Sequence, residues 1–163
     1  MYEAEKALLL PAIGDHAVAI EHIGSTAVPG LAAKPIIDIM VGLGRLEDAP
    51  ITVEPLRLLG YEYVPEFEAE LPDRRYFRKG PISSRTHHLH MVAHGGPFWE
   101  RQLLFRDYLC AHPETARAYA RLKRDLAAMF GDDREGYTYA KTSFIGSMEE
   151  SARTEKAQRR SSG

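Results

Sequence analysis

The sequence predicts an α/β or α+β fold, in which a mixed β-sheet is followed by a C-terminal layer of three helices. Before residue 93, short β-branched and aromatic runs show the period of two that is typical of strands. From Gly96 onward the apolar residues recur with a helical period of about 3.6 instead. No internal repeat or linker divides the chain, so we expect one domain over residues 1–150 and a polar, frayed tail over residues 151–163.

The expected elements can be placed in order along the chain. A short helix over residues 4–10 should end at Pro11 and Gly14, because both residue types interrupt helices. Strands are expected at residues 17–23, 36–41, 61–64, 75–78 and 88–92, with a helix at residues 50–59 between the second and the third. The last three strands are close in sequence, which indicates an antiparallel meander. Helices should follow at residues 99–110, at 113–130 and after a cap at Asp132 or Asp133.

Charge, hydropathy and cysteine content exclude several classes of protein. A formal net charge of -2 argues against a dedicated nucleic-acid binder, which usually carries a basic excess. No apolar stretch approaches the roughly 20 residues that a membrane span needs. Cys110 is the only cysteine and forms no internal disulfide, so the expected compartment is the reducing cytoplasm.

Asp38 is the most informative single residue. It lies within the apolar run from Ile36 to Val41, which predicts a strand that is buried on both faces. An ionised carboxylate in such a strand is costly unless a partner neutralises it. A basic side chain, hydrogen-bond donors or a metal ion could serve, and a metal ion would make Asp38 functional.

A turn rich in glycine and small residues, from Gly24 to Gly30, precedes the Asp38 strand. A Gly-Ser turn after a strand presents backbone N–H groups and a hydroxyl, which can bind a phosphate without a charged side chain. The patterns of the Walker loop, the nucleophile elbow and the dinucleotide-binding loop are absent. A tight turn with no ligand remains the alternative interpretation.

His88 and His90 are two residues apart on an expected strand, so their side chains share a face. Together with a carboxylate they could hold a divalent ion, although a pair of histidines hydrogen-bonded in or near the core is the more common origin of this pattern. Five basic residues come shortly before them and indicate either a solvated sheet edge or phosphate recognition: Arg74, Arg75, Arg78, Lys79 and Arg85. Strand alternation lets only part of this cluster point toward one ligand.

The stretch from His22 to Ile39, HIGSTAVPGLAAKPIIDI, closely resembles the signature of the GrpB family. Further similar segments are Gly60-Tyr61, Arg75-Tyr76-Phe77, His88-Leu89-His90, Phe105 to Leu109 with His112-Pro113, and Tyr139 to Lys141 with Phe144-Ile145. The resemblance implies a nucleotidyltransferase-like fold, related to a domain that is fused to dephospho-coenzyme A kinase in some bacteria. Nearly the whole chain is covered, apart from its first residues and its tail.

In active nucleotidyltransferases a Gly-Ser turn holds the triphosphate, and three carboxylates bind two magnesium ions. The resemblance implies that Gly24 and Ser25 bind phosphate and that Asp38 is the first of the catalytic, metal-binding carboxylates. We further expect Asp38, His90 and His88 to hold a divalent metal, which could be Mg, Mn or Zn. Thr26, Lys34, Arg75 and Lys141 are further candidates for phosphate or nucleotide binding. The chain departs from the pattern where Met40 replaces the second carboxylate and histidines replace the third.

Three hypotheses follow from these residues. The first is a nucleotidyltransferase-like protein that binds a nucleotide or other phosphorylated small molecule and transfers a nucleoside monophosphate to a small acceptor. The second is a catalytically inactive accessory module that binds a nucleotide or a coenzyme A precursor. The third is purely structural, with Asp38 hydrogen-bonded to the N–H groups of the Gly-Ser turn.

Overall fold

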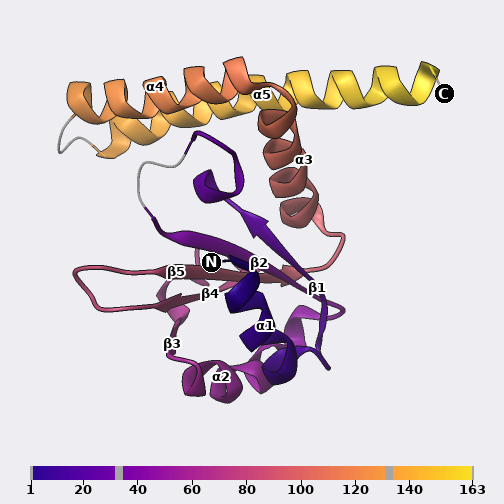
Figure 1. Ribbon diagram of the computed structural model, residues 1–163, viewed down its shortest axis with the longest axis vertical. Helices are drawn as coiled ribbons and strands as arrows, with labels where there is room; N and C mark the ends of the chain where they lie inside the picture. Colours follow the sequence, from indigo (N-terminus) through magenta and orange to yellow (C-terminus); the bar gives the residue numbers. More distant parts are fainter. Residues whose placement is uncertain (1, 32–34, 131–133, 163) are drawn as a thin grey trace. The chain divides into compact units, whose positions relative to one another are not determined.

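The computed structural model describes residues 2–31, 35–130 and 134–162, which form two compact units (Figure 1). The first unit comprises Met1–Ala27 and Lys34–Glu100, and the second comprises Val28–Ala33 and Arg101–Gly163. The predicted single domain over residues 1–150 stays a prediction. In the described part of the chain, no helix is long and apolar enough to cross a membrane.

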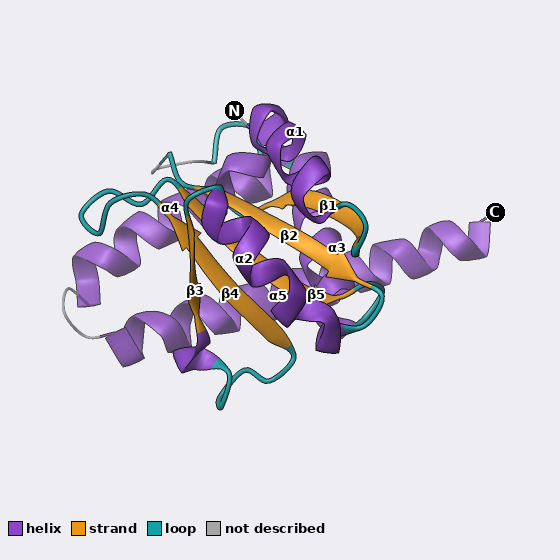
Figure 2. Cartoon of the chain, turned by 90° about the horizontal axis from the view of Figure 1, so that it is seen from below, coloured by secondary structure: helices purple, strands orange, loops and turns teal. Residues whose placement is uncertain are grey.

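The first unit is built on a mixed five-stranded sheet with the order β1-β2-β5-β4-β3 (Figure 2). Its strands are β1 (Ala17–Ile23), β2 (Ile37–Leu43), β3 (Tyr61–Val64), β4 (Arg74–Lys79) and β5 (His87–Ala93). The central strands β2 and β5 run parallel, and every other neighbouring pair is antiparallel. The predicted mixed sheet and the antiparallel meander of its last three strands are therefore confirmed.

Two helices, α1 (Tyr2–Ile13) and α2 (Ala49–Leu58), cover one face of this sheet (Figure 1). Alternate residues of β2, namely Ile37, Ile39, Val41 and Leu43, pack against them in the main apolar core. The predicted end of α1 at Pro11 is wrong, because the helix includes Pro11 and continues to Ile13. A proline in the last turn removes only one helical hydrogen bond, and full burial of Leu9 and Ile13 offsets that loss.

The second unit is helical. Its helices are α3 (Pro97–Ala111), whose first residues belong to the first unit, α4 (Pro113–Phe130) and α5 (Arg134–Ser162). Its core is formed by Val28, Leu31, Leu109, Ala116, Tyr119 and Met148. The segment with the composition of a frayed tail continues α5 as far as Ser162. Ion pairs one turn apart, Arg153 with Glu149 and Arg159 with Glu155, support a helix in this polar segment.

Candidate functional site

The sheet face opposite α1 and α2 carries three of the predicted site residues, Asp38, His88 and His90, and we call it the Asp38 face. Register places Asp38 beside His88, and Met40 beside His90, across the parallel β2–β5 pair. On the other side of β5, Tyr76 of β4 lies beside His90. The prediction that the two histidines share a face is therefore confirmed, and that face is the one that carries Asp38.

Asp38 is less enclosed than its apolar neighbours suggest. Its side chain retains 25% exposure, whereas Met40, two residues further along the same face, is fully buried. The Asp38 carboxylate lies beside His88, with 3.4 Å between Oδ1 and Nδ1. Because water still reaches the carboxylate, its charge costs less than complete burial would impose.

The backbone of Gly24 packs directly against the side chain of Asp38. The last residue of β1, Ile23, pairs with Asp38, so the turn begins beside this carboxylate. Gly24 has a φ of 75°, in the left-handed region that favours glycine. A Cβ atom on Gly24 would lie 2.5 Å from Oδ2 of Asp38 and 2.9 Å from its Cβ. Only glycine therefore brings the backbone of the turn this close to the carboxylate.

The rest of the turn is supported from the helix-covered side of the sheet. Ser25 to Ala27 form a short 3-10 turn. The Thr26 hydroxyl lies 2.8 Å from Nε2 of His22, and the His22 ring stacks on Tyr2 of α1 with centroids 4.6 Å apart. Thr26 thus already has a protein partner. The backbone groups of Gly24 and Ser25 are therefore better placed than the Thr26 hydroxyl to bind a ligand beside Asp38.

His90 is neutral at physiological pH. Burial lowers its pKa to about 4, and the positive charge of Arg74 acts in the same direction while Asp38 opposes it. Its Nδ1 atom is buried and has no hydrogen-bond partner among the residues that the structure describes. Leaving an N–H unpaired in that position would be costly, so the proton belongs on Nε2. His90 is therefore a hydrogen-bond donor through Nε2.

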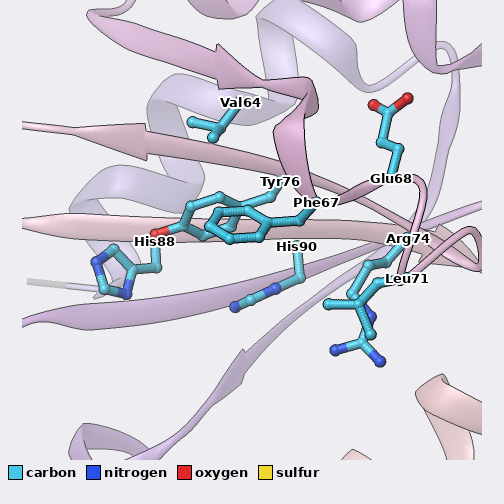
Figure 3. A pocket seen from close by; sticks show the side chains of 8 residues that line it. All are labelled: Val64, Phe67, Glu68, Leu71, Arg74, Tyr76, His88 and His90. Carbon is cyan, nitrogen blue, oxygen red and sulfur yellow. The ribbon is translucent and has the colours of Figure 1, made fainter.

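A cavity of about 320 Å³ adjoins the Asp38 face (Figure 3). Eight residues line it: Val64, Phe67, Glu68, Leu71, Arg74, Tyr76, His88 and His90. The rings of Phe67 and Tyr76 meet edge to face with centroids 6.0 Å apart, and those of Tyr76 and His90 lie 5.3 Å apart. Because His88 also contacts Asp38, the cavity and the carboxylate share one wall.

The basic residues of β4 divide between the two faces of the sheet. Arg75, which sequence reasoning selected for phosphate, pairs in register with the buried Met91 on the helix-covered face. Its guanidinium donates to the carbonyls of Pro72 and Arg74 and lies 3.6 Å from Glu68. Arg74 lines the cavity, with its guanidinium 4.0 Å above the Phe98 ring. Lys34 and the side chain of Lys141 lie outside the described residues.

The described side chains on this face that could coordinate a metal are too few to hold a cation alone. They fit a cation that is also coordinated by a bound ligand. Over the described ranges, no group of three His, Cys, Asp or Glu side chains could hold a metal ion. Asp38 offers hard oxygen and His88 lies beside it. Magnesium often takes only one or two carboxylates and completes its coordination with phosphate oxygens and water. Metal-ligating histidines usually donate their second N–H to an acceptor, and His90 Nδ1 has no such partner.

Sequence reasoning missed Phe67, Leu71 and Tyr76 as site residues, and it named Arg74 only as one member of the basic cluster. Arg74 and Tyr76 alternate with Arg75 and Phe77, so strand periodicity puts the two pairs on opposite faces of β4. It does not show which pair faces the site. Phe67 and Leu71 lie in the segment between β3 and β4, where no periodic pattern exists.

Comparison with known proteins places these features in a family context. A family model described as GrpB protein matches residues 1–151. The chain is similar to the UPF0157 protein YqkA of Bacillus subtilis, with 43% identity over 152 residues, which is 93% of this chain and 43% of YqkA. The crystal structure of conserved protein GrpB from Enterococcus faecalis matches with a TM-score of 0.80 and 39% identity, covering 94% of this chain and 91% of that one.

A dephospho-CoA kinase of Mycolicibacterium paratuberculosis is also similar, with 31% identity over 155 residues. That alignment covers 82% of this chain and 38% of the kinase. The chain thus spans less than half the length of both YqkA and the kinase. The structural match to the Enterococcus protein confirms the α+β fold class with its five-stranded mixed sheet.

Proposed function

We propose that this chain, which belongs to the GrpB family, binds the phosphate groups of a nucleotide or another phosphorylated small molecule on the Asp38 face. One divalent cation would lie between Asp38 and the phosphate oxygens, with His88 beside it. The observation that carries this proposal is the contact of Gly24 with Asp38, because it brings exposed turn backbone and a carboxylate to one point. Backbone N–H groups of the turn favour an anion there.

The cation follows from the electrostatics of that contact. A phosphate on the turn would lie on the order of 5 Å from the Asp38 carboxylate, where two like charges repel by about 3 kcal/mol at an effective dielectric constant of about 20. A divalent cation between the two anions converts this repulsion into attraction. Phosphate binding should therefore depend on both the metal and the charge of Asp38. His90 would donate from Nε2 to a ligand oxygen instead of binding the metal.

Calorimetric titration with inorganic tripolyphosphate tests this proposal, using Asp38→Asn and the exposed loop variant Asp15→Asn as a matched control. With Mn²⁺ or Mg²⁺, the wild type and Asp15→Asn should bind at least about tenfold more tightly than Asp38→Asn. With a chelator the order should reverse, because removal of the Asp38 charge relieves the repulsion of the anion. Equal affinities of Asp38→Asn and wild type under both conditions would exclude the proposal.

A second candidate is the catalytically inactive accessory module, which would bind its ligand without a metal. Full burial of Met40 at the position of the second carboxylate favours it, since a thioether is a poor ligand for magnesium. Dephospho-coenzyme A is a ligand to test here, given the similarity to a dephospho-CoA kinase. The metal dependence of binding separates the two, and incubation of labelled nucleoside triphosphates with Mn²⁺ and candidate acceptors tests whether the Asp38 site also transfers a nucleoside monophosphate. Equal turnover by the wild type and Asp38→Ala would favour the inactive module.

A further inference from the structure

The cavity beside Asp38 has the lining of a site for a planar ring. Phe67 and Leu71, on the segment between β3 and β4, are 48% and 36% exposed although both line it. Two large apolar side chains on one rim leave a surface that a ligand would cover. Tyr76 and Val64 add apolar wall from β4 and β3 (Figure 3). The volume of about 320 Å³ is at the lower end for small-molecule pockets.

The polar groups of the cavity are mainly hydrogen-bond donors. The Nε of Arg74 already donates to Asp73, so its terminal N–H groups and the Nε2–H of His90 are the donors that can reach a ligand from two neighbouring strands. The acidic residue of the lining, Glu68, already accepts a hydrogen bond from Tyr63 and pairs with Arg75 at 3.6 Å. A ligand group with acceptor atoms at its edge therefore fits this cavity better than a cation or a plain hydrocarbon.

We propose that this cavity binds a nucleobase, or a similar heteroaromatic ring, of the same phosphorylated ligand whose phosphates lie at Gly24 and Asp38. The inference rests on the proposed function for the phosphate end, but it depends on different residues. Aromatic side chains give stacking surface that accepts any base. Because His88 lines the cavity and lies 3.4 Å from Asp38, ring and phosphates of one small molecule can occupy adjacent positions.

Phe67→Ala is the variant that tests this inference, since the exposed ring contributes little to the core. Ile82→Ala is the matched control, because Ile82 is an 89% exposed apolar residue that lies between β4 and β5 and does not line the cavity. Both variants should unfold at the same urea concentration as the wild type. Calorimetry with Mn²⁺ then compares four nucleoside triphosphates, the corresponding nucleosides and inorganic tripolyphosphate.

The inference predicts that nucleoside triphosphates bind more tightly than tripolyphosphate, and that Phe67→Ala weakens only the base-containing ligands, by about fivefold or more. Ile82→Ala should leave every affinity unchanged. Equal affinity of the wild type for triphosphate with and without a base would overturn the inference and leave the proposed function standing. The inference would also be overturned if Phe67→Ala weakened the affinity for tripolyphosphate as much as the affinity for nucleoside triphosphates. Nucleoside binding without tripolyphosphate binding would support the ring site and refute the proposed phosphate site.

Discussion

Replacement of Gly24 by alanine should reveal the contact on which the proposed site depends. Two costs are expected. A non-glycine residue at a φ of 75° costs about 1–2 kcal/mol. The new Cβ would also lie 2.5 Å from Oδ2 of Asp38 and 3.0 Å from its Cγ, and relief of such overpacking typically costs about 1–3 kcal/mol more. Gly24→Ala should therefore lower the free energy of unfolding by about 2–5 kcal/mol.

Gly95→Ala separates these two costs. Gly95 lies in the same unit and has a φ of 77°, but a Cβ there would meet nothing within 4 Å. Its substitution carries only the backbone cost. Urea unfolding, followed by far-ultraviolet circular dichroism and by the fluorescence of the single tryptophan, Trp99, measures both variants. The reasoning is refuted if Gly24→Ala destabilises the protein no more than Gly95→Ala does.

Two further predictions concern buried ionisable groups. Burial lowers the pKa of His90 from 6.5 to about 4. Between these pH values the unfolded chain binds a proton at His90 that the folded chain does not bind. The free energy of unfolding should therefore fall by up to about 3 kcal/mol as the pH drops from 6.5 to about 4. Urea titrations at several pH values should show that His90→Gln lacks this part of the slope, and identical slopes would contradict the assignment. Glu5, which is 6% exposed and accepts hydrogen bonds from Tyr61 and Lys79, should cost about 2 kcal/mol or more when changed to Gln. The exposed Glu54→Gln variant should show no measurable change in the free energy of unfolding. Equal effects of Glu5→Gln and Glu54→Gln would refute a stabilising role for the hydrogen bonds that Glu5 accepts.

Local patterns predicted much of the fold. The strand at residues 17–23 has the bounds that its pattern predicts, and the spacing of His88 and His90 correctly placed both on one face. Helix α1 exceeded its predicted end because burial of Leu9 and Ile13 outweighs the local effect of Pro11. Period and propensity are properties of neighbouring residues, so they are readable without tertiary structure.

The arrangement of the site depends on tertiary contacts that no local pattern contains. The parallel pairing of β2 with β5, which puts Asp38 beside His88, joins strands that are far apart in the sequence. Strand alternation puts Arg74 and Arg75 on opposite faces of the sheet, but it is the packing of α1 and α2 that determines which of these faces is buried in the main core. The partial exposure of Asp38 was likewise unreadable, because the surrounding apolar run predicts burial on both faces.

An anomalous-scattering map from crystals that contain Mn²⁺ and a non-hydrolysable nucleoside triphosphate tests the proposed site most directly. We expect a manganese peak that contacts the Asp38 carboxylate and the phosphate oxygens, with the phosphates at Gly24 and Ser25. Phosphates bound elsewhere, or bound at this turn without a manganese peak at Asp38, would contradict the proposed metal-dependent site.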